Sequence, residues 1–181
     1  MNHKHKRTLV VLAVLAALVA CCGGAGAWLY NKVATAALIS YSQSQLHIIW
    51  HALYEHASEH GGEYPTGYGV LVWSGAISPE LLVSPFERSE AIDEYDWDQV
   101  YTSETPPPGL DAFIERNGSY VVLVWGQPRT DSPDVLFAYE RLRRGSRGTP
   151  LIYADRKVLF VPNAEAERLI RAAGHEPVWA D

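Results

Sequence analysis

The chain has 181 residues and carries 15 Lys or Arg against 21 Asp or Glu, which gives a formal net charge of −6. This length suits a single domain and excludes a multidomain enzyme. Gly and Pro are scattered without a period and the two cysteines are neighbours, so collagen, low-complexity disorder and a disulfide scaffold are excluded. Hydrophobic residues make up 48% of the chain, but many of them lie in one block near the N-terminus.

A run of uncharged residues, Thr8–Tyr30, follows a basic tail at residues 1–7. As a helix, this run would be about 34 Å long, enough to cross the roughly 30 Å of a bilayer core. The tail carries Lys4, Lys6 and Arg7, and positive charge before a membrane helix places the N-terminus in the cytoplasm. We therefore expect a cytoplasmic tail at 1–7, a transmembrane helix at 8–30 and an extracytoplasmic domain at 31–181.

An alternative interpretation of the same segment is a lipoprotein signal that ends at residue 20. Leu18-Val19-Ala20-Cys21 resembles a lipobox, in which small residues precede a cysteine that becomes lipidated. A third interpretation is a signal that is cleaved to release a soluble form, and all three place residues 33–181 outside the cytoplasm. If the segment is instead kept as a membrane helix, small residues four apart could allow it to self-associate; they are Ala16, Ala20 and Gly24.

The segment after the membrane run has the pattern of a long amphipathic helix. Residues 33–60 contain neither Pro nor Gly, and Gly61-Gly62 ends the pattern. The apolar residues recur at helical spacing and share one face: Leu38, Ile39, Leu46, Ile49, Trp50, Leu53, Tyr54 and Ala57. Ser78-Pro79 predicts the start of a short helix, and residues 85–111 are predicted to be an irregular, acidic surface loop.

The last third of the chain changes to short runs of β-branched and aromatic residues. These runs predict a small antiparallel sheet with strands at 119–125, 135–139, 151–154 and 157–161. Asp155-Arg156 is predicted to form a two-residue hairpin turn between the last two strands. Residues 164–173 predict a closing helix, whereas 111–116 fits either a short helix or the arm of a hairpin. The expected fold class is α+β: a long N-terminal helix, first membrane-spanning and then amphipathic, packed on a small antiparallel sheet.

This layout resembles that of type IV pilins and type II secretion pseudopilins. The local sequence resembles the pilin-like proteins of planctomycete-type bacteria in four pieces: Ser42–Pro65, Ile77–Pro85, Leu136–Glu140 and Leu151–Val161. The resemblance implies a structural or interaction protein in the bacterial inner membrane, with a single span, a cytoplasmic N-terminus and a periplasmic C-terminal domain.

The chain also departs from the family. The glycine of a prepilin processing signal is absent, and Arg7-Thr8-Leu9-Val10-Val11 keeps only a trace of the motif that follows it. No glutamate lies inside the apolar run, which argues against the usual route into a filament. The closing hairpin has Asp155-Arg156-Lys157 where the family usually has Asp-Gly-His, and Ser42 and Ser84 stand where relatives often have cysteines.

Two groups of residues could hold a metal ion. His47, His51 and Glu55 follow one another at intervals of four residues and would share a helix face, and His56 and His60 form a second pair. A solvated polar face is the simpler explanation of both sets. The second group supplies oxygen ligands of the kind that calcium prefers, without EF-hand spacing: Asp93, Glu94, Asp96 and Asp98. We assign neither group as a metal site and expect no cofactor.

Partner binding is a simpler expectation than catalysis. Four arginines between two predicted strands could contact an acidic partner or lipid headgroups: Arg141, Arg143, Arg144 and Arg147. Ser119 lacks the motif of a nucleophile elbow, and His175 lies in the C-terminal tail, so no catalytic residue is assigned. Residues 31–181 carry 12 basic and 21 acidic side chains, a net charge of −9, which disfavours nucleic-acid binding.

The sequence therefore predicts a non-enzymatic, membrane-anchored, pilin-like or pseudopilin-like protein. Its expected partners are the membrane and other proteins, which it would contact through the extracytoplasmic domain. The alternative is a lipoprotein anchored through Cys21 that binds a ligand or a metal ion through the histidine face.

Overall fold

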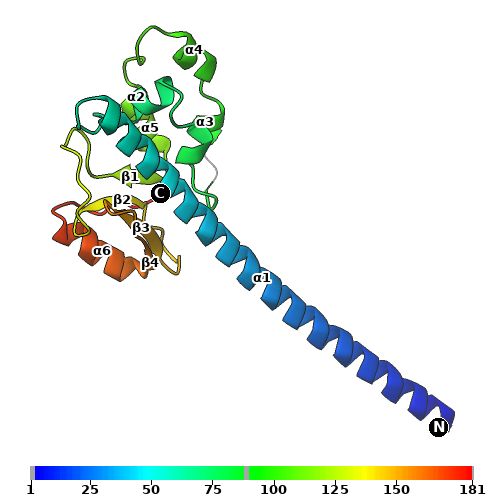
Figure 1. The fold of residues 1–181 in the computed structure, drawn as a ribbon. Coiled ribbons are helices and arrows are strands. Elements are labelled where there is room, and N and C mark those ends of the chain that lie inside the picture. Colours follow the sequence, from blue (N-terminus) through cyan, green and yellow to red (C-terminus); the bar gives the residue numbers. More distant parts are fainter. Residues whose placement is uncertain (1–2, 88–89, 181) are drawn as a thin grey trace. The chain divides into compact units, whose positions relative to one another are not determined.

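The computed structural model describes residues 3–87 and 90–180, with side chains from Trp28 onward (Figure 1). The chain divides into two compact units, residues 1–39 and residues 40–181. Helix α1 (His3–Glu59) makes up the described part of the first unit and contributes its last turns to the second. The second unit contains every strand and all the other helices of the described chain.

No helix in the part of the chain whose side chains are described is long and apolar enough to cross a membrane. This finding overturns the predicted localisation, a single-pass protein of the bacterial inner membrane with a periplasmic domain. From Trp28 onward, α1 carries polar residues such as Asn31, Lys32 and Thr35, which interrupt its apolar positions. Most of the predicted 8–30 span, the lipobox with Cys21 and the small residues Ala16, Ala20 and Gly24 lie outside the side chains that the structure describes.

The predicted antiparallel sheet is confirmed. Its strands are neighbours in chain order, as expected for short connections, and each pairs antiparallel with the next. The four strands are β1 (Tyr120–Val122), β2 (Leu136–Glu140), β3 (Thr149–Tyr153) and β4 (Val158–Val161). Every residue of β2 is buried, because this central strand is covered on both of its faces.

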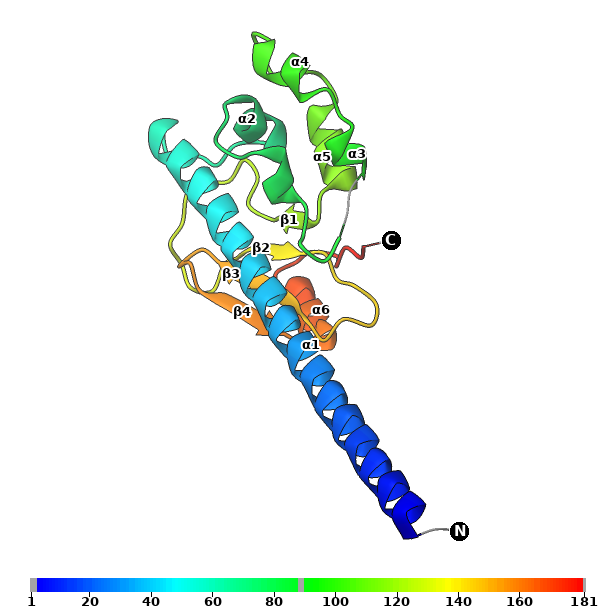
Figure 2. The same ribbon diagram turned by 90° about the vertical axis from the view of Figure 1, so that its right-hand side faces the viewer.

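The two faces of the sheet carry different packing partners (Figures 1 and 2). On one face, Phe137 and Ile152 join a core that contains the predicted stripe of α1, Leu46, Ile49 and Leu53, all without exposed surface. On the other face, a smaller core is covered by α6 (Asn163–Ala172) and contains Leu136, Tyr139, Leu151, Ala166 and Ile170. The domain is thus an α+β sandwich of helix, sheet and helix, and the predicted closing helix is confirmed.

The β3–β4 turn differs from the predicted two-residue loop. The N–H of Arg156 donates to the Tyr153 carbonyl at 2.9 Å, and the N–H of Tyr153 donates to the Lys157 carbonyl at 3.0 Å. The loop is therefore three residues long, from Ala154 to Arg156. Arg156 has φ = 73°, in the left-handed region that usually takes glycine, and this conformation returns the chain to the right-handed twist of the strands.

Residues 85–111 are not the irregular loop that the sequence predicts. Short helices fill much of this segment and the region around it, and buried side chains hold them: Ile92, Val100 and Leu110. Helices of four to eight residues show too little periodicity to be read from a sequence. The helical elements are α2 (Tyr68–Trp73), the 3-10 helix η1 (Pro79–Leu82), α3 (Glu90–Asp93), α4 (Trp97–Thr102) and α5 (Leu110–Asn117), so residues 111–116 are helical.

Gly148 permits the close approach of the β2–β3 loop to β4. A Cβ atom at this position would lie 2.3 Å from the Val161 carbonyl oxygen and 3.0 Å from the Phe160 ring. We expect Gly148→Ala to lower the free energy of unfolding by about 1–3 kcal/mol, because main chain must move to relieve the overlap. Arg147→Ala, one residue away and exposed, should change it by less than about 0.5 kcal/mol. Equal effects of the two variants in chemical denaturation would contradict this packing.

Candidate functional site

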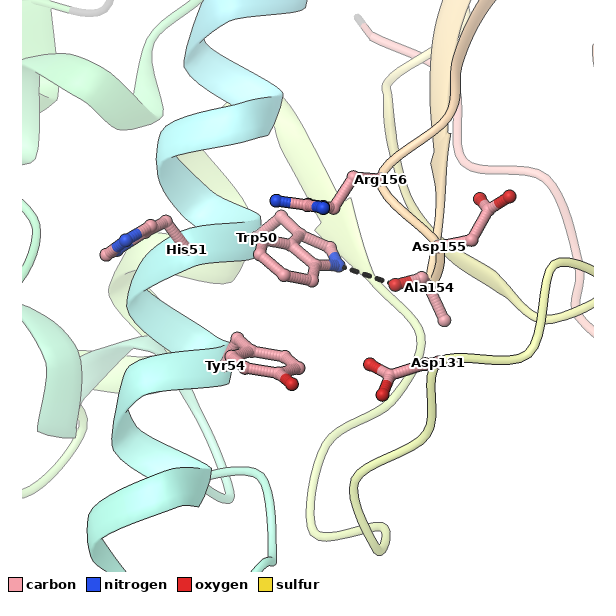
Figure 3. A pocket seen from close by; sticks show the side chains of 7 residues that line it. All are labelled: Trp50, His51, Tyr54, Asp131, Ala154, Asp155 and Arg156. Carbon is pink, nitrogen blue, oxygen red and sulfur yellow. Dashed lines mark hydrogen bonds between the residues drawn. The ribbon is translucent and has the colours of Figure 1, made fainter.

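A pocket of about 450 Å³ opens on the helix α1 side of the sheet (Figure 3). Three separate segments of the domain line it: α1, the loop between β1 and β2, and the β3–β4 turn. Its lining residues are Trp50, His51, Tyr54, Asp131, Ala154, Asp155 and Arg156. The volume lies in the range of about 300–1,000 Å³ that is typical of small-molecule sites.

A stacked pair of aromatic rings forms one wall of the pocket. Trp50 and Tyr54 are four residues apart on α1, a spacing that brings side chains of a helix into contact. Their ring centroids are 4.6 Å apart and their planes differ by 21°. The indole N–H of Trp50 donates to the Ala154 carbonyl at 3.0 Å. This hydrogen bond joins the helix to the β3–β4 turn and fixes the orientation of the pair.

Arginines cover the two outer faces of the aromatic pair. The guanidinium of Arg156 lies 5.5 Å from the Trp50 ring, and that of Arg129 lies 4.5 Å from the Tyr54 ring. Both distances are within the range of a cation–π interaction. Arg129 also donates to the Ser58 hydroxyl at 2.8 Å, so its position is fixed by a second contact.

Three polar groups of the pocket are left free. Across residues 28–87 and 90–180, the Tyr54 hydroxyl, the Asp131 carboxylate and the Arg156 guanidinium have no hydrogen bond and no ion pair. In contrast, Asp155 accepts a hydrogen bond from the Lys157 N–H at 3.0 Å, and its carboxylate points away from Trp50 (Figure 3). The pocket therefore offers a free donor, a free acceptor and a hydroxyl that can act as either.

A buried polar cluster, centred on Glu140, holds the elements around the pocket in place. Glu140 ends β2 and is 1% exposed. Its carboxylate accepts hydrogen bonds from the Ser42 hydroxyl and, at 2.6 Å, from the Ser84 hydroxyl, and it is paired with the Arg143 guanidinium. These partners come from α1, from the segment after η1 and from the β2–β3 loop, so one carboxylate joins three parts of the chain. We call Ser42, Ser84, Glu140 and Arg143 the Glu140 cluster.

Neighbouring residues extend this cluster. Tyr120 donates to Gln45 at 2.7 Å, and the amide of Gln45 donates to the Val83 carbonyl at 2.9 Å. Burial raises the pKa of the Tyr120 hydroxyl above its ordinary value, which keeps it protonated and able to donate. Burial also lowers the pKa of the Arg143 guanidinium, while the nearby Glu87 acts in the opposite direction.

The four arginines of the predicted patch differ in their surroundings. Arg143 belongs to the Glu140 cluster, and Arg141 donates to the carbonyls of Glu115 and Arg116. Arg144 and Arg147 are exposed, and neither makes an ion pair or hydrogen bond with any residue that the structure describes. A sequence cannot separate arginines that support the fold from those that face solvent, because the partners of Arg143 are distant in the chain.

The histidine face forms a surface groove without a metal cluster. His47, His51 and Glu55 line a groove of about 330 Å³, and the Nδ1 atom of His51 lies 3.6 Å from a Glu55 oxygen. Among the side chains that the structure describes, no three His, Cys, Asp or Glu residues are placed to hold a metal ion. The predicted shared face is correct, but nothing gathers its side chains around a point.

His56 and His60 stack on each other instead of chelating. Their rings are 3.9 Å apart and nearly parallel, at 8°, and the Nδ1–H of His60 donates to the His56 carbonyl at 2.8 Å. Burial lowers the pKa of His56 and repulsion from His60 lowers it further, whereas Glu59 acts to raise it.

The four members of the acidic group lie on α3, on α4 and on the turn between them, and each is exposed. Asp93 ends α3, and Asp96 caps α4 by accepting the Gln99 N–H at 3.2 Å. This capping bond gives Asp96 a structural role. Asp98 lies in the first turn of α4, where a negative charge is favourable.

Ser119 and His175 have separate environments. Ser119 is fully buried; its hydroxyl donates to Glu87 and accepts from the Ser84 N–H at 2.8 Å. His175 follows α6, and its N–H donates to the Ile170 carbonyl. Among residues 28–87 and 90–180, the two side chains make no hydrogen bond with each other, so they offer no nucleophile and base.

Sequence reasoning missed most of the pocket. Trp50 and Tyr54 were expected to belong to the apolar stripe of α1, and they do contact the core. Asp131 and Arg156 gave no signal because their positions beside α1 depend on loop geometry. The aromatic pair four residues apart was the one local sign.

No protein-family model, curated protein or solved structure matches the chain. A function must therefore be argued from the residues and geometry described above.

The Glu140 cluster predicts a large loss of stability when its central charge is removed. Glu140→Gln keeps the shape of the side chain but leaves the partly buried Arg143 with only its longer ion pair to Glu87, at 3.8 Å. We expect the free energy of unfolding to fall by about 2–4 kcal/mol. Glu165→Gln is the matched control, because Glu165 pairs with Arg168 on the exposed surface of α6, and its effect should be much smaller. Similar denaturation midpoints for the two variants would contradict a central role for Glu140.

The stacked histidines predict a pH dependence with a defined sign. The folded state lowers the pKa of His56, so His56 binds a proton less readily than in the unfolded chain. Its contribution to stability is therefore complete above the unfolded pKa of about 6.5 and declines as the pH falls through that value. In an NMR titration, His60→Gln should raise the pKa of His56, because the repulsion from His60 is lost. A value that falls or stays unchanged would contradict this coupling.

Proposed function

We propose that this chain is a non-enzymatic structural or interaction protein with a pilin-like domain in residues 40–181. The proposal is supported by the order of elements, in which the last turns of α1 pack on an antiparallel sheet that the chain enters later. The four pieces that resemble pilin-like proteins belong to α1 with its C-terminal turn, the η1 segment, β2 and the β3–β4 hairpin.

The observation that carries the proposal concerns Ser42 and Ser84. These serines stand where relatives in the pilin-like group often have cysteines. They are 42 residues apart in the sequence, yet their hydroxyls bind the two oxygens of one carboxylate, that of Glu140. Positions that a disulfide could join in relatives are thus joined here through a buried carboxylate. The Glu140 cluster would then serve the same purpose, which is to fix α1 to the segment after η1.

A structural or interaction role requires a rigid frame and an accessible contact surface. The Glu140 cluster supplies the frame. For the surface, Arg144 and Arg147 remain exposed in the loop between β2 and β3. Their guanidinium groups would suit an acidic partner protein, since arginine binds carboxylates through paired hydrogen bonds.

This role can be tested by partner recovery with the full chain. The tagged protein is crosslinked in its source cells and purified, and co-purified proteins are quantified against it. We expect one or more proteins in near-stoichiometric amount, and we expect Arg144→Glu/Arg147→Glu to reduce their recovery at least about tenfold.

A control with the same change in charge is available elsewhere on the domain. Arg116→Glu/Lys157→Glu replaces two exposed cations outside this loop and should leave recovery unchanged. If the wild-type chain recovers no protein in substantial amount, the structural role is wrong. If both double variants recover partners equally well, Arg144 and Arg147 do not form the contact.

A further inference from the structure

We propose that the pocket between α1 and the β3–β4 turn is a binding site for a neutral oligosaccharide, held by Tyr54, Asp131 and Arg156. This inference does not rest on the structural role proposed above. It starts from the three polar groups of the pocket that have no hydrogen bond or ion pair in the described chain, and from the elements that present them (Figure 3).

The Arg156 side chain is oriented by its contact with Trp50. Its guanidinium lies over the Trp50 ring at 5.5 Å, and Trp50 is itself held by its hydrogen bond to Ala154. A guanidinium that lies over a ring keeps its N–H donors free in its own plane. Little side-chain freedom remains to be lost on binding, which favours affinity. Arg156 is therefore a pre-oriented donor without an acceptor.

The acceptor groups of the pocket lie apart from Arg156. The Asp131 carboxylate points toward Tyr54, while Arg156 lies on the other side of the aromatic pair (Figure 3). Because the stacked rings of Trp50 and Tyr54 separate the two charges, a single small ion cannot bind both. A ligand must be long enough to reach past the rings, and it must accept a hydrogen bond at one end and donate at the other.

The main-chain groups of the β3–β4 turn favour a saccharide over an extended peptide. Peptides that add to a sheet need free main-chain groups on the protein. In the turn that lines the pocket, the Ala154 carbonyl accepts from Trp50, the Ala154 N–H donates to Val135 at 3.0 Å, and the Arg156 N–H donates to Tyr153. This turn is therefore no free strand edge, and the groups that approach the aromatic pair are the side chains of Tyr54, Asp131 and Arg156. Sugar hydroxyls both donate and accept, so they can satisfy a guanidinium, a carboxylate and a phenol together.

The charges of the lining side chains favour a neutral ligand. Of the Asp and Arg side chains that line the pocket, Arg156 and Asp131 approach the aromatic pair and have opposite sign, whereas the Asp155 carboxylate points away from Trp50. A ligand with a net charge would be attracted by one of them and repelled by the other. A neutral ligand avoids this repulsion, and the volume of about 450 Å³ admits a short oligosaccharide.

The experiment uses the full chain on an array of neutral and acidic oligosaccharides, followed by calorimetric titration of the best neutral binder. Tyr54→Phe removes the hydroxyl, and Asp131→Asn removes the charge and exchanges one acceptor oxygen for a donor, so each should weaken binding about three- to tenfold. Asp134→Asn is the matched control, because Asp134 is exposed in the same loop and does not line the pocket; its affinity should equal that of the wild type.

Arg156→Gly gives the sharpest test. Glycine suits the left-handed backbone at this position, where φ is 73°, so the hairpin should stay folded. The donors of the guanidinium are lost, so binding should fall at least about tenfold while the thermal midpoint stays near that of the wild type. The melting curve thus separates a lost ligand contact from a damaged fold.

Each other outcome contradicts the site. The inference fails if no neutral oligosaccharide binds, if the array selects acidic glycans alone, or if the three pocket variants bind as well as Asp134→Asn. The array needs only the folded chain, whereas partner recovery tests protein contacts in the cell. Failure of the oligosaccharide site can therefore be told apart from failure of the structural role.

Discussion

The position of α1 on the sheet depends on the buried carboxylate of Glu140. A charge with 1% exposure is costly unless it is paired, so Ser42, Ser84 and Arg143 must all be in place before its burial is favourable. This requirement couples α1, the segment after η1 and the β2–β3 loop. The contact of Ser42 with Glu140 also fixes the position of α1 along its own axis relative to the sheet. The hydrogen bond from Trp50 to Ala154, about 12 Å further along the helix, is a second contact of this kind. The pocket forms beside the second of these contacts, where the helix cannot slide.

The Glu140 cluster and the pocket differ in how many of their polar groups have hydrogen bonds or ion pairs. At the Glu140 cluster, each oxygen of the carboxylate has partners, and the side chains are buried or nearly so. At the pocket, the aromatic pair is packed, but Tyr54, Asp131 and Arg156 face outward without partners in the described chain. Buried polar groups are normally satisfied inside the fold, as they are at the Glu140 cluster. The Asp131 and Arg156 side chains are exposed, so they stay accessible to the proposed ligand.

The elements that could be predicted from the sequence are those in which apolar residues recur at a regular spacing. The stripe of Leu46, Ile49 and Leu53 and the β-branched strands were correct because burial of one face leaves a repeating signal. Helices α3 and α4 were missed because they are too short to repeat. The Glu140 cluster was missed for another reason: Ser42 and Arg143 are about a hundred residues apart, and nothing local marks them as neighbours. Arg156 was placed in the correct turn, but with the wrong loop length, because its conformation is one that arginine rarely adopts.

The backbone of Arg156 links the fold to the proposed site. A residue with a side chain costs about 1 kcal/mol or more in the left-handed region, where glycine costs little. The contact with Trp50 returns about 0.5–1 kcal/mol at an exposed site, so the fold by itself gains almost nothing from arginine here. The same conformation directs the side chain back over α1 and leaves its donors free. These donors, which make no hydrogen bond within the described chain, are the groups that the proposed ligand would use.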